Sequence, residues 1–489
     1  MKRRNESGMQ RIKRQIGLWL PIGLFCTAVL LLVLPGDRMF LAGSAIGAVA
    51  AISTTGVLVL REKAIRIFWL TGDSVLLGYA LGSFNTAVRL VFEGFSVSAS
   101  SGSTPSELCS ALAVSLLVSA LLFSMGALEP QLEINPNRIT NSDQRFVWIG
   151  LVLVAVAFAS GNLVFRGITV SDSGKISALG SIAETLVEIL PALTVFLYGK
   201  ASSKNQRLVL ILAGLAEFLV ATSQSRRTLI YAVLISFLAL TLRGFKLQLR
   251  KFKTIATLVI SVTCVYAGMT FFQAMRYSQQ GSGNNKLAFS ETSGRALNLL
   301  TQGDDARFTL GLTENLRDRT FIIGYLSELL AATSTHAPLY GEDALLCLKL
   351  SIPSVLYPNK SAALDVGAEE VIANPQFGLP VDDEANSLLT SGVSDLGVIG
   401  AFMYPVLISL VASVFLRALS KRVPEIVKLV IVLMFATVMI QSEKGLVEYF
   451  DLLRQTVVFV LLCWPIAKFA QRRSQLRGSR SLVPIPAGL

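Results

Sequence analysis

The sequence predicts an all-α polytopic membrane protein, a bundle of about twelve transmembrane helices interrupted by one large polar segment. Composition, hydropathy and the grouping of apolar residues carry this prediction. Hydrophobic residues make up 52% of the 489 residues and charged residues only 16%, a balance that is unusual for a soluble globular protein. The mean hydropathy is +0.59. The apolar residues form runs that come near the roughly 20 residues needed to cross a bilayer as a helix.

The runs follow one another regularly along the chain. Nine of them precede the polar segment: Ile16 to Leu34, Met39 to Leu60, Ile67 to Phe92, Ala111 to Leu128, Phe146 to Val164, Ile176 to Tyr198, Leu208 to Thr222, Thr228 to Leu242 and Ile255 to Phe272. Three more follow it: Val393 to Leu416, Ile426 to Ile440 and Leu452 to Ala470. The first run has no small-residue cleavage site before Asp37, so we expect an uncleaved helix and not a signal peptide.

Basic residues set the orientation, because Lys and Arg beside short loops resist translocation. The N-terminus is expected in the cytoplasm, since it carries Arg3, Arg4, Arg11, Lys13 and Arg14. Alternate threading then divides the chain into residues 1–272 with helices one to nine, a periplasmic loop at residues 273–392, residues 393–470 with helices ten to twelve, and a cytoplasmic tail at residues 471–489. We expect the inner membrane of a bacterium.

The charges agree with this threading. Between Gln273 and Asn386 there are eight Lys/Arg against fourteen Asp/Glu, so this segment carries −6 and the remainder +18 of the formal +12. Basic cytoplasmic edges facing anionic lipid explain the high pI, and nucleic-acid binding is not expected.

The large loop contains short helices of its own. We expect a flexible lead-in at Tyr277 to Asn285, an amphipathic helix at Asp318 to Ala332 and a short apolar segment at Ala344 to Leu350 that Pro353 stops. Both apolar pieces are too short to cross a bilayer, so they suit helices that lie along the outer surface or dip between the bundle helices. The loop is therefore expected to cover a cavity as a lid.

Motifs for metal, cofactor and nucleotide chemistry are missing from the sequence. Of five cysteines only Cys347 falls in the loop, so no disulfide framework is expected there. The chain has no metal-ligand spacing, no phosphate-binding P-loop, no HExxH and no GxSxG. We therefore expect no metal and no cofactor.

Two arginines occupy the tight outer turn between the seventh and eighth helices. Because cations on an outward turn work against insertion, Arg226 and Arg227 need a compensating reason. Two guanidinium groups beside a helix N-terminus would form a good site for a phosphate. The alternative is that they bind lipid headgroups or pair with Glu217.

Other polar residues are expected on the outer side. Glu184 and Glu188 lie one turn apart on the sixth helix, where carboxylates need cationic partners; structural pairing and acid–base work are both open. His336, the only histidine, has a side chain whose ordinary pKa suits a general base, but it is also an ordinary loop residue. An acid of Asp382-Asp383-Glu384 is an equally good base candidate. Further outer cations are Arg276, Arg295, Arg307 and Lys360.

Three stretches together resemble a known family. Gly341-Glu342-Asp343 through Ser351-Ile352-Pro353-Ser354-Val355-Leu356-Tyr357-Pro358-Asn359-Lys360 is similar to the G-then-IPR-x-x-W-P-x-K-P pattern of bacterial oligosaccharide repeat-unit polymerases of the O-antigen polymerase (Wzy) type. Ser225-Arg226-Arg227 resembles that family's S-R-G/R turn. Asn386, followed by Asp395-Leu396-Gly397-Val398-Ile399-Gly400, resembles its N-x-L and F/L-G-x-x-G pattern. Ser354 and Tyr357 depart from the pattern, which often has Arg and Trp there.

The resemblance implies an inverting, metal-independent glycosyltransferase with a GT-C-like bundle. Its substrates would be oligosaccharides linked to undecaprenyl diphosphate at the outer leaflet, and a chain-length regulator and a flippase would be further partners. Arg226, Arg227, Arg276 and Lys360 would then bind the pyrophosphate, and His336, Asp383 or Glu384 would deprotonate the acceptor hydroxyl. Supporting roles fall to Glu184, Glu188 and Asn386.

Three other functions stay open at this point. An O-antigen ligase shares nearly the whole layout and differs in its acceptor. A lipid-linked oligosaccharide flippase or secondary transporter would have inverted repeats and short loops throughout, and the sequence has no visible repeat. A structural assembly partner is the third.

Overall fold

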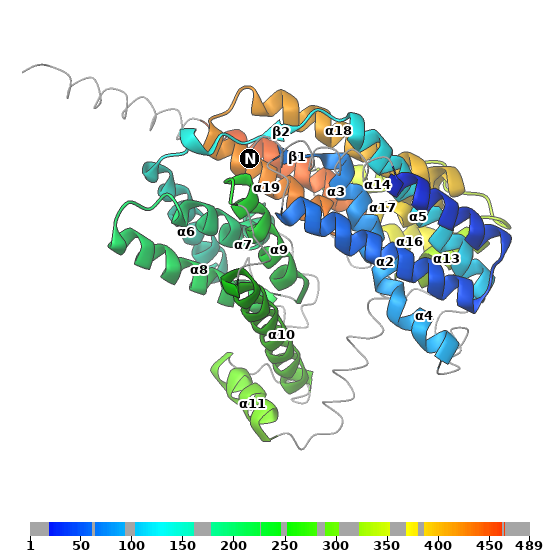
Figure 1. Cartoon of the computed structure of the whole chain (residues 1–489), viewed down its shortest axis with the longest axis horizontal. Helices are drawn as coiled ribbons and strands as arrows, with labels where there is room; N and C mark the ends of the chain where they lie inside the picture. The colour runs from blue at the N-terminus through cyan, green and yellow to red at the C-terminus, as the bar shows by residue number, and fades with distance from the viewer. Residues whose placement is uncertain are drawn as a thin grey trace, which may run out of the picture.

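The computed structural model describes residues 19–60, 64–92, 103–160, 178–224, 226–245, 252–280, 289–302, 322–352, 368–379, 386–461 and 464. These residues are mostly helical (84%) and form one bundle (Figure 1). The only strands in this part of the chain are β1 (Ala64–Ile65) and β2 (Leu132–Glu133), which pair antiparallel with Ala64 opposite Glu133.

The helices follow the order of the apolar runs. A first helix, Trp19–Val33, is followed by α2 (Asp37–Leu60), α3 (Ile67–Val75), the π-helix η1 (Leu76–Leu81), α4 (Gly82–Phe92), α5 (Pro105–Leu128), α6 (Arg145–Ala159), α7 (Ala178–Tyr198), α8 (Lys204–Gln224), α9 (Arg226–Leu242) and α10 (Phe252–Gln280). The polar segment supplies α11 (Phe289–Gln302), α13 (Ile323–Ala332), α14 (Glu342–Ser351) and α16 (Ala368–Phe377). Then come α17 (Leu388–Leu396), α18 (Val398–Ser420), α19 (Glu425–Met439) and a last helix over residues 446–461.

Five helices among the described residues are long and apolar enough to cross a membrane: Asp37–Leu58, Ile67–Phe92, Pro105–Leu128, Lys204–Thr222 and Val398–Ser420. Shorter apolar helices accompany them, among them Trp19–Val33, Arg145–Ala159 and Thr228–Leu242. Each of the twelve apolar runs overlaps a helix, so the prediction of an all-α membrane protein is confirmed at this level. The number of spans stays a prediction.

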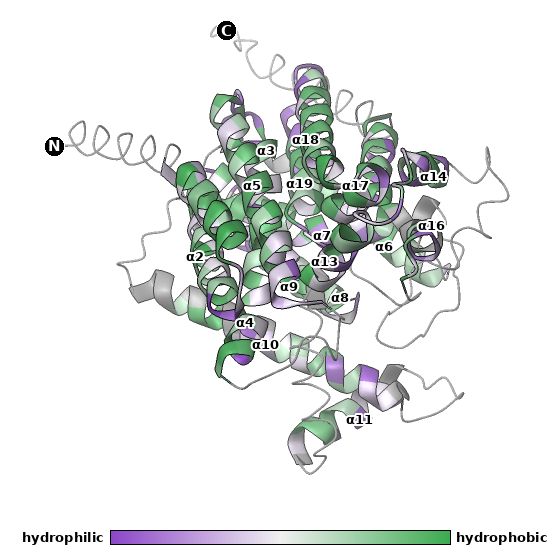
Figure 2. Ribbon diagram, turned by 90° about the vertical axis from the view of Figure 1, so that its right-hand side faces the viewer, coloured by the Kyte–Doolittle hydropathy of each residue, from purple (hydrophilic) through white to green (hydrophobic). Residues whose placement is uncertain are grey.

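Exposed apolar stripes mark the surface that faces lipid. On α8, four leucines at a spacing of three and four residues are all more than half exposed, namely Leu208, Leu212, Leu215 and Leu219. A soluble protein rarely leaves such a stripe in water, whereas hydrocarbon solvates it at no cost. Figure 2 shows the same apolar character along most helices of the bundle, while α14 carries more polar residues.

The centre of the bundle is α19. Thirteen of its residues, Ile426 to Met439 except Lys428, are buried, and it packs against α3, α7, α9 and α18. A helix that is apolar all round is stable only when neighbours cover every face. In contrast, α10 and α11 lie at one edge of the bundle in both views (Figures 1 and 2).

Two parts of the chain differ in detail from the sequence expectation. The predicted tenth helix, Val393 to Leu416, is two helices, α17 and α18, that meet at Gly397. The amphipathic helix predicted at Asp318 to Ala332 is described as α13 from Ile323, and most of its residues are buried against α5 and α17.

Polar groups tie one end of the bundle together. The buried Glu129, just after α5, accepts hydrogen bonds from Ser413 Oγ on α18 (2.6 Å) and from the backbone N–H of Phe68 on α3 (3.1 Å). Arg417 lies 3.3 Å from the same carboxylate. Because this carboxylate joins α5, α3 and α18, it fixes how the three helices are positioned along the bundle axis relative to one another.

A second buried acid joins α2 to α3. Asp73 is fully buried and accepts hydrogen bonds from Thr54, and from Thr55 Oγ1 at 2.6 Å. Both carboxylate oxygens are thus paired, which accounts for an acid inside an apolar helix without a catalytic role.

Candidate functional site

A polar centre lies where η1, the start of α17 and the turn after α19 meet. Ser387 is the N-cap of α17, and its hydroxyl accepts hydrogen bonds from the backbone N–H groups of Leu389 and Thr390 (both 3.2 Å). The same oxygen lies 2.5 Å from Tyr79 Oη of η1, and both residues are buried. A helix cap of this kind satisfies orphan backbone donors and holds Asn386, the next residue outward, at a fixed place.

The π-helix brings its backbone directly onto the turn at residues 441–445. A Cβ atom on Gly78 would lie 2.3 Å from Ser442 Cβ and 2.7 Å from Ile322 Cδ1. Only glycine therefore allows η1, α13 and this turn to touch. Single π-turns inside α-helices occur frequently at functional sites, because the extra residue re-aims the neighbouring side chains.

The turn after α19 is polar, and its neighbours are polar too. Gln441 is buried and donates from Nε2 to Glu188 Oε2 of α7 (3.3 Å). Tyr449, at the start of the last helix, is buried. It interacts electrostatically with Glu448, Tyr231 and Tyr79. Hydroxyl, amide and carboxylate groups from four helices thus gather around one turn.

The predicted anion site begins α9. Its first residues are Arg226 and Arg227, whose side chains lie outside the described part of the structure. The end of α8, directly before them, carries Gln224, which is only 4% exposed and whose Nε2 has no hydrogen-bond partner in the part of the chain that the structure describes. α8 ends at Gln224 and α9 begins at Arg226, so both helices extend into the stretch between the two predicted apolar runs.

The other predicted residues on the bundle are half-buried. Glu184 and Glu188 lie on α7, which packs along α9, and Arg276 lies near the end of α10, which also contacts α9. The structure therefore brings the helices that carry Glu184, Glu188, Arg226, Arg227 and Arg276 together around α9.

The candidate bases are placed differently. His336 follows α13 and is exposed, and its Nδ1 lies 3.0 Å from Thr335 Oγ1. Three residues later, the N–H of Leu339 donates to Ser394 O (2.9 Å), which places this segment at the C-terminal end of α17. Asn386 lies at the other end of α17, and nine helical residues span about 13 Å. Asp383, Glu384 and Lys360 lie outside the described residues.

Two of the resembling stretches pack against each other. Asp395, fully buried, accepts hydrogen bonds from the N–H groups of Gly341 (3.1 Å), Asp343 (3.0 Å) and Ala344 (2.9 Å) at the start of α14. It also accepts one from Tyr404 Oη at 2.5 Å. An acid that binds several N–H groups at a helix N-terminus stabilises that terminus. This motif position is thus structural.

A second acid is buried beside it. Asp343 is fully buried, and its Oδ2 has no hydrogen-bond partner among the described residues. Burial, and then the charge of Asp395, raise the pKa of Asp343 to about 7. The Cys347 thiol, 3.6 Å from Oδ1, opposes this shift weakly.

The glycines of the same motif set the contact between α17 and α18. A Cβ on Gly392 would lie 2.2 Å from Gly400 O, and one on Gly400 would lie 1.8 Å from Gly392 O. Between them, Gly397 has φ 63° and ψ −152°, a conformation essentially restricted to glycine. The two helices therefore approach backbone to backbone.

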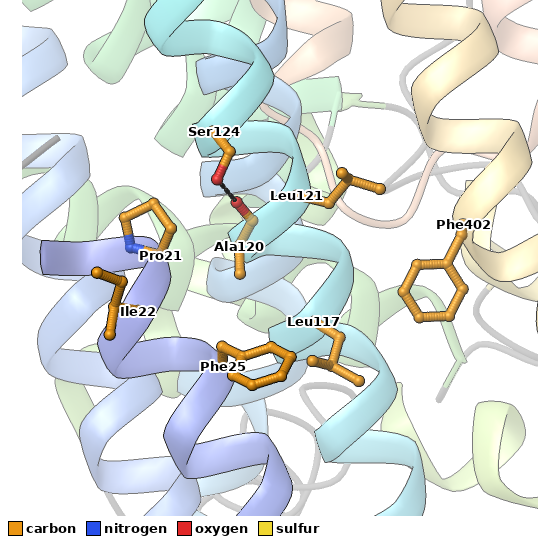
Figure 3. A pocket seen from close by; sticks show the side chains of 8 residues that line it. All are labelled: Pro21, Ile22, Phe25, Leu117, Ala120, Leu121, Ser124 and Phe402. Carbon is orange, nitrogen blue, oxygen red and sulfur yellow. Dashed lines mark hydrogen bonds between the residues drawn. The ribbon is translucent and has the colours of Figure 1, made fainter. Parts of the chain in front are cut away.

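An apolar groove of about 560 Å³ lies on another face, between the first helix, α5 and α18 (Figure 3). Its polar lining residue is Ser124, whose hydroxyl donates to Ala120 O (2.8 Å). The remaining lining side chains are Pro21, Ile22, Phe25, Leu117, Ala120, Leu121 and Phe402. The groove offers no ionisable group for chemistry. Within the described residues, no group of three His, Cys, Asp or Glu side chains could hold a metal.

Sequence reasoning missed the contribution of Tyr79, Ser387 and the turn at residues 441–445. One signal was available: Gln441-Ser442-Glu443-Lys444-Gly445 with Glu448 is a polar, charged interruption between two apolar runs. The partnership of Tyr79 with Ser387 spans 308 positions and leaves no local pattern.

Comparison with protein-family models, curated proteins and solved structures finds no match to this chain.

Proposed function

We propose that the chain polymerises undecaprenyl-diphosphate-linked oligosaccharide repeat units into a surface polysaccharide, as an inverting, metal-independent glycosyltransferase of the bacterial inner membrane. The proposal includes twelve spans, a cytoplasmic N-terminus and a periplasmic segment at residues 273–392. Its motif basis is the resemblance to O-antigen polymerases.

One observation carries the proposal: the start of α9 unites three features of a phosphate site. Arg226 and Arg227 are its first residues, its N-terminus has the positive end of the helix dipole, and Gln224 beside it has a buried N–H donor that finds no partner among the described residues. A buried donor left unpaired costs about 1–3 kcal/mol. A bound anion would accept that hydrogen bond, which explains why the cost is tolerated.

Contacts at the predicted cytoplasmic side support the threading. The loops after α2 and α5 pair as β1 and β2, and Lys428 at the start of α19 donates to Glu133 O (2.5 Å). Arg243 after α9 donates to Gly199 O after α7 (2.5 Å). Each of these contacts joins segments that the positive-inside rule assigns to the same side.

Contacts at the predicted periplasmic side behave in the same way. Ser103 Oγ before α5 lies 2.5 Å from Ser327 Oγ of α13, and Cys109 Sγ donates to Gly36 O (3.6 Å). Thr185 of α7 donates to Gln455 Oε1 (2.6 Å). A threading with one span more or fewer between two partners would place them on opposite sides of a bilayer, so these pairs support the register of the spans, while the basic residues set its direction.

The chemistry follows from the substrate. A diphosphate leaving group needs fixed cations, which stabilise the charge that develops as the glycosidic C–O bond breaks. Arg226, Arg227 and Arg276 would supply them, together with Lys360. A base would take the proton of the acceptor hydroxyl as that oxygen attacks the anomeric carbon from the opposite face.

Deletion of the gene tests the function. We expect surface glycolipid that carries single repeat units, resolved by gel electrophoresis. Long chains that are not attached to lipid would instead identify a ligase, and loss of any outward-facing repeat unit would identify a flippase. An unchanged polysaccharide would contradict all three.

Arginine variants test the anion site in the complemented deletion strain. Arg226→Ala and Arg227→Ala should reproduce the single-repeat phenotype at normal membrane levels. The matched control is Arg295→Ala, because Arg295 is half-exposed on α11 and pairs with Glu291 at 2.9 Å. Normal chain length in both test variants would refute the anion-site assignment.

A further inference from the structure

The length of α19 bears on the depth of the turn that joins it to the last helix. α19 has 15 residues, and at about 1.5 Å per residue it is about 22 Å long, against about 30 Å of hydrocarbon. If α19 starts at the cytoplasmic boundary, where Glu425 and Lys428 lie 3.6 Å apart, residues 441–445 end several ångströms short of the opposite boundary. The turn then lies inside the membrane, on the outer side of its midplane.

Two charged side chains at this turn have no partner among the residues that the structure describes. Lys444 and Glu448 are half-buried, and neither makes a hydrogen bond or ion pair with the described residues. Other charged side chains nearby do have partners. Arg454 forms an ion pair with Asp451 at 3.0 Å, and Glu188 accepts a hydrogen bond from Gln441. Half-buried charges without partners are expensive at membrane depth, so they mark a place where a ligand supplies the partner.

The surrounding side chains suit a sugar. Tyr79, Tyr231 and Tyr449 lie near one another, and the Tyr79 hydroxyl meets Ser387 at 2.5 Å. Tyr79 and Tyr449 are buried, so the side chains that a sugar could contact here are the half-buried Tyr231, Lys444 and Glu448, whose polar groups can exchange hydrogen bonds with sugar hydroxyl groups. Tyr231 lies one helical turn after Arg227 on α9, so this cluster adjoins the phosphate site.

We propose that the acceptor sugar binds at this turn, with Glu448 as the general base and Lys444 as a ligand of the diphosphate. The Glu448 carboxylate takes the proton of the acceptor hydroxyl while the hydroxyl oxygen forms the new bond to the anomeric carbon. The bond from that carbon to the diphosphate oxygen breaks, and its electron pair leaves with the diphosphate, whose charge Lys444 and the arginines of α9 stabilise. This inference rests on the proposed function and assigns its base to a residue other than His336, Asp383 or Glu384.

The test measures polymerisation by the purified full-length protein in proteoliposomes that contain undecaprenyl-diphosphate-linked repeat units. Removing a general base typically costs 10²–10⁴-fold, so Glu448→Gln should lower the rate at least about 100-fold with little change in KM. Lys444→Ala should raise KM and lower the rate together. Glu342→Gln and Lys349→Ala are the matched controls, because both side chains are exposed on α14, and they should keep the wild-type rate.

The outcomes separate this inference from the proposed function. If the deletion strain makes single repeats and Glu448→Gln restores full-length chains, the base assignment is overturned and the polymerase stands. If the deletion strain makes normal chains, the proposed function itself fails. Should Glu448→Gln be absent from membranes, Glu448→Asp decides: a slowed rate with a shifted pH profile supports the base, and a wild-type rate overturns it.

Discussion

Asp343 in the first turn of α14 and Asp395 in the last turn of α17 are both buried but have opposite effects on stability, so substitutions at the two positions should shift the Tm in opposite directions. Asp395 accepts four hydrogen bonds, while Asp343 beside it has an oxygen for which the described residues offer no partner. Asp395→Asn keeps the shape but turns one acceptor oxygen into an N–H₂ donor. In the place of Oδ1, that donor would face the N–H groups of Gly341 and Asp343. In the place of Oδ2, it would face the N–H of Ala344 and the hydroxyl of Tyr404.

The size of the effect follows from these bonds. Hydrogen bonds to a charged group contribute about 1.5–3 kcal/mol each, so losing two costs about 3–6 kcal/mol. Relief of the repulsion from Asp343 returns part of this, which leaves about 3 kcal/mol. At about 2.1 cal/mol/K per residue, a chain of 489 residues has an unfolding entropy near 1 kcal/mol/K, so the Tm should fall by about 3 °C.

Asp343→Asn should instead raise the Tm, by an amount that depends on the pH. The folded protein holds the Asp343 proton up to about pH 7, whereas the unfolded chain releases it near 3.8. The contribution of Asp343 to stability is therefore lost as the pH rises from about 4 to about 7. The asparagine variant escapes this loss, so its Tm should exceed that of the wild type by more at pH 8 than at pH 5.

Thermal unfolding in detergent, followed by the loss of the monodisperse peak in size-exclusion chromatography, measures both variants. An Asp395→Asn protein as stable as the wild type, or an Asp343→Asn protein that is less stable at pH 8, would refute the reasoning about this pair.

Three further predictions use other contacts. Gly392→Ala places a Cβ 2.2 Å from Gly400 O, so α17 and α18 must separate, and the same thermal assay should show a loss of about 1–3 kcal/mol; an unchanged Tm would contradict the backbone contact. Glu129→Ala leaves Ser413, Arg417 and the Phe68 N–H without their acceptor and should destabilise the protein by about 3 kcal/mol, with Glu129→Gln intermediate, and equal Tm values would argue against the network. His336→Ala should retain long polysaccharide chains in the complemented strain, because the side chain is exposed and bonded to Thr335; single repeats would restore it as the base.

The helices could be predicted from the sequence because hydrophobic runs report directly on burial in lipid or protein. Each predicted run overlaps a helix, and the Pro105 start of α5 even has its sequence signature, with Thr104 and Glu107 forming the capping box. The break of the tenth run at Gly397 was less visible, since both flanking segments are apolar. Its cause is a backbone contact between Gly392 and Gly400, which no periodicity encodes.

The candidate site was predictable only in part. Unusual cations in a short turn pointed to Arg226 and Arg227, because charge at a membrane boundary needs a reason. The depth of the turn at residues 441–445 depends on the length of α19, and the link between Tyr79 and Ser387 depends on the whole fold. Residues 341–343 and 395–400 drew attention as a motif, yet Asp395 and the glycines hold helices together.

The most direct test of the central claim is reconstitution. Purified protein in proteoliposomes should convert undecaprenyl-diphosphate-linked single repeats into a ladder of longer lipid-linked chains and release one undecaprenyl diphosphate for each bond formed, in the presence of a chelator and without nucleotide. The account predicts that the ladder disappears when Arg226 and Arg227 are both replaced by alanine. Single repeats that remain unchanged with the folded wild-type protein would contradict it.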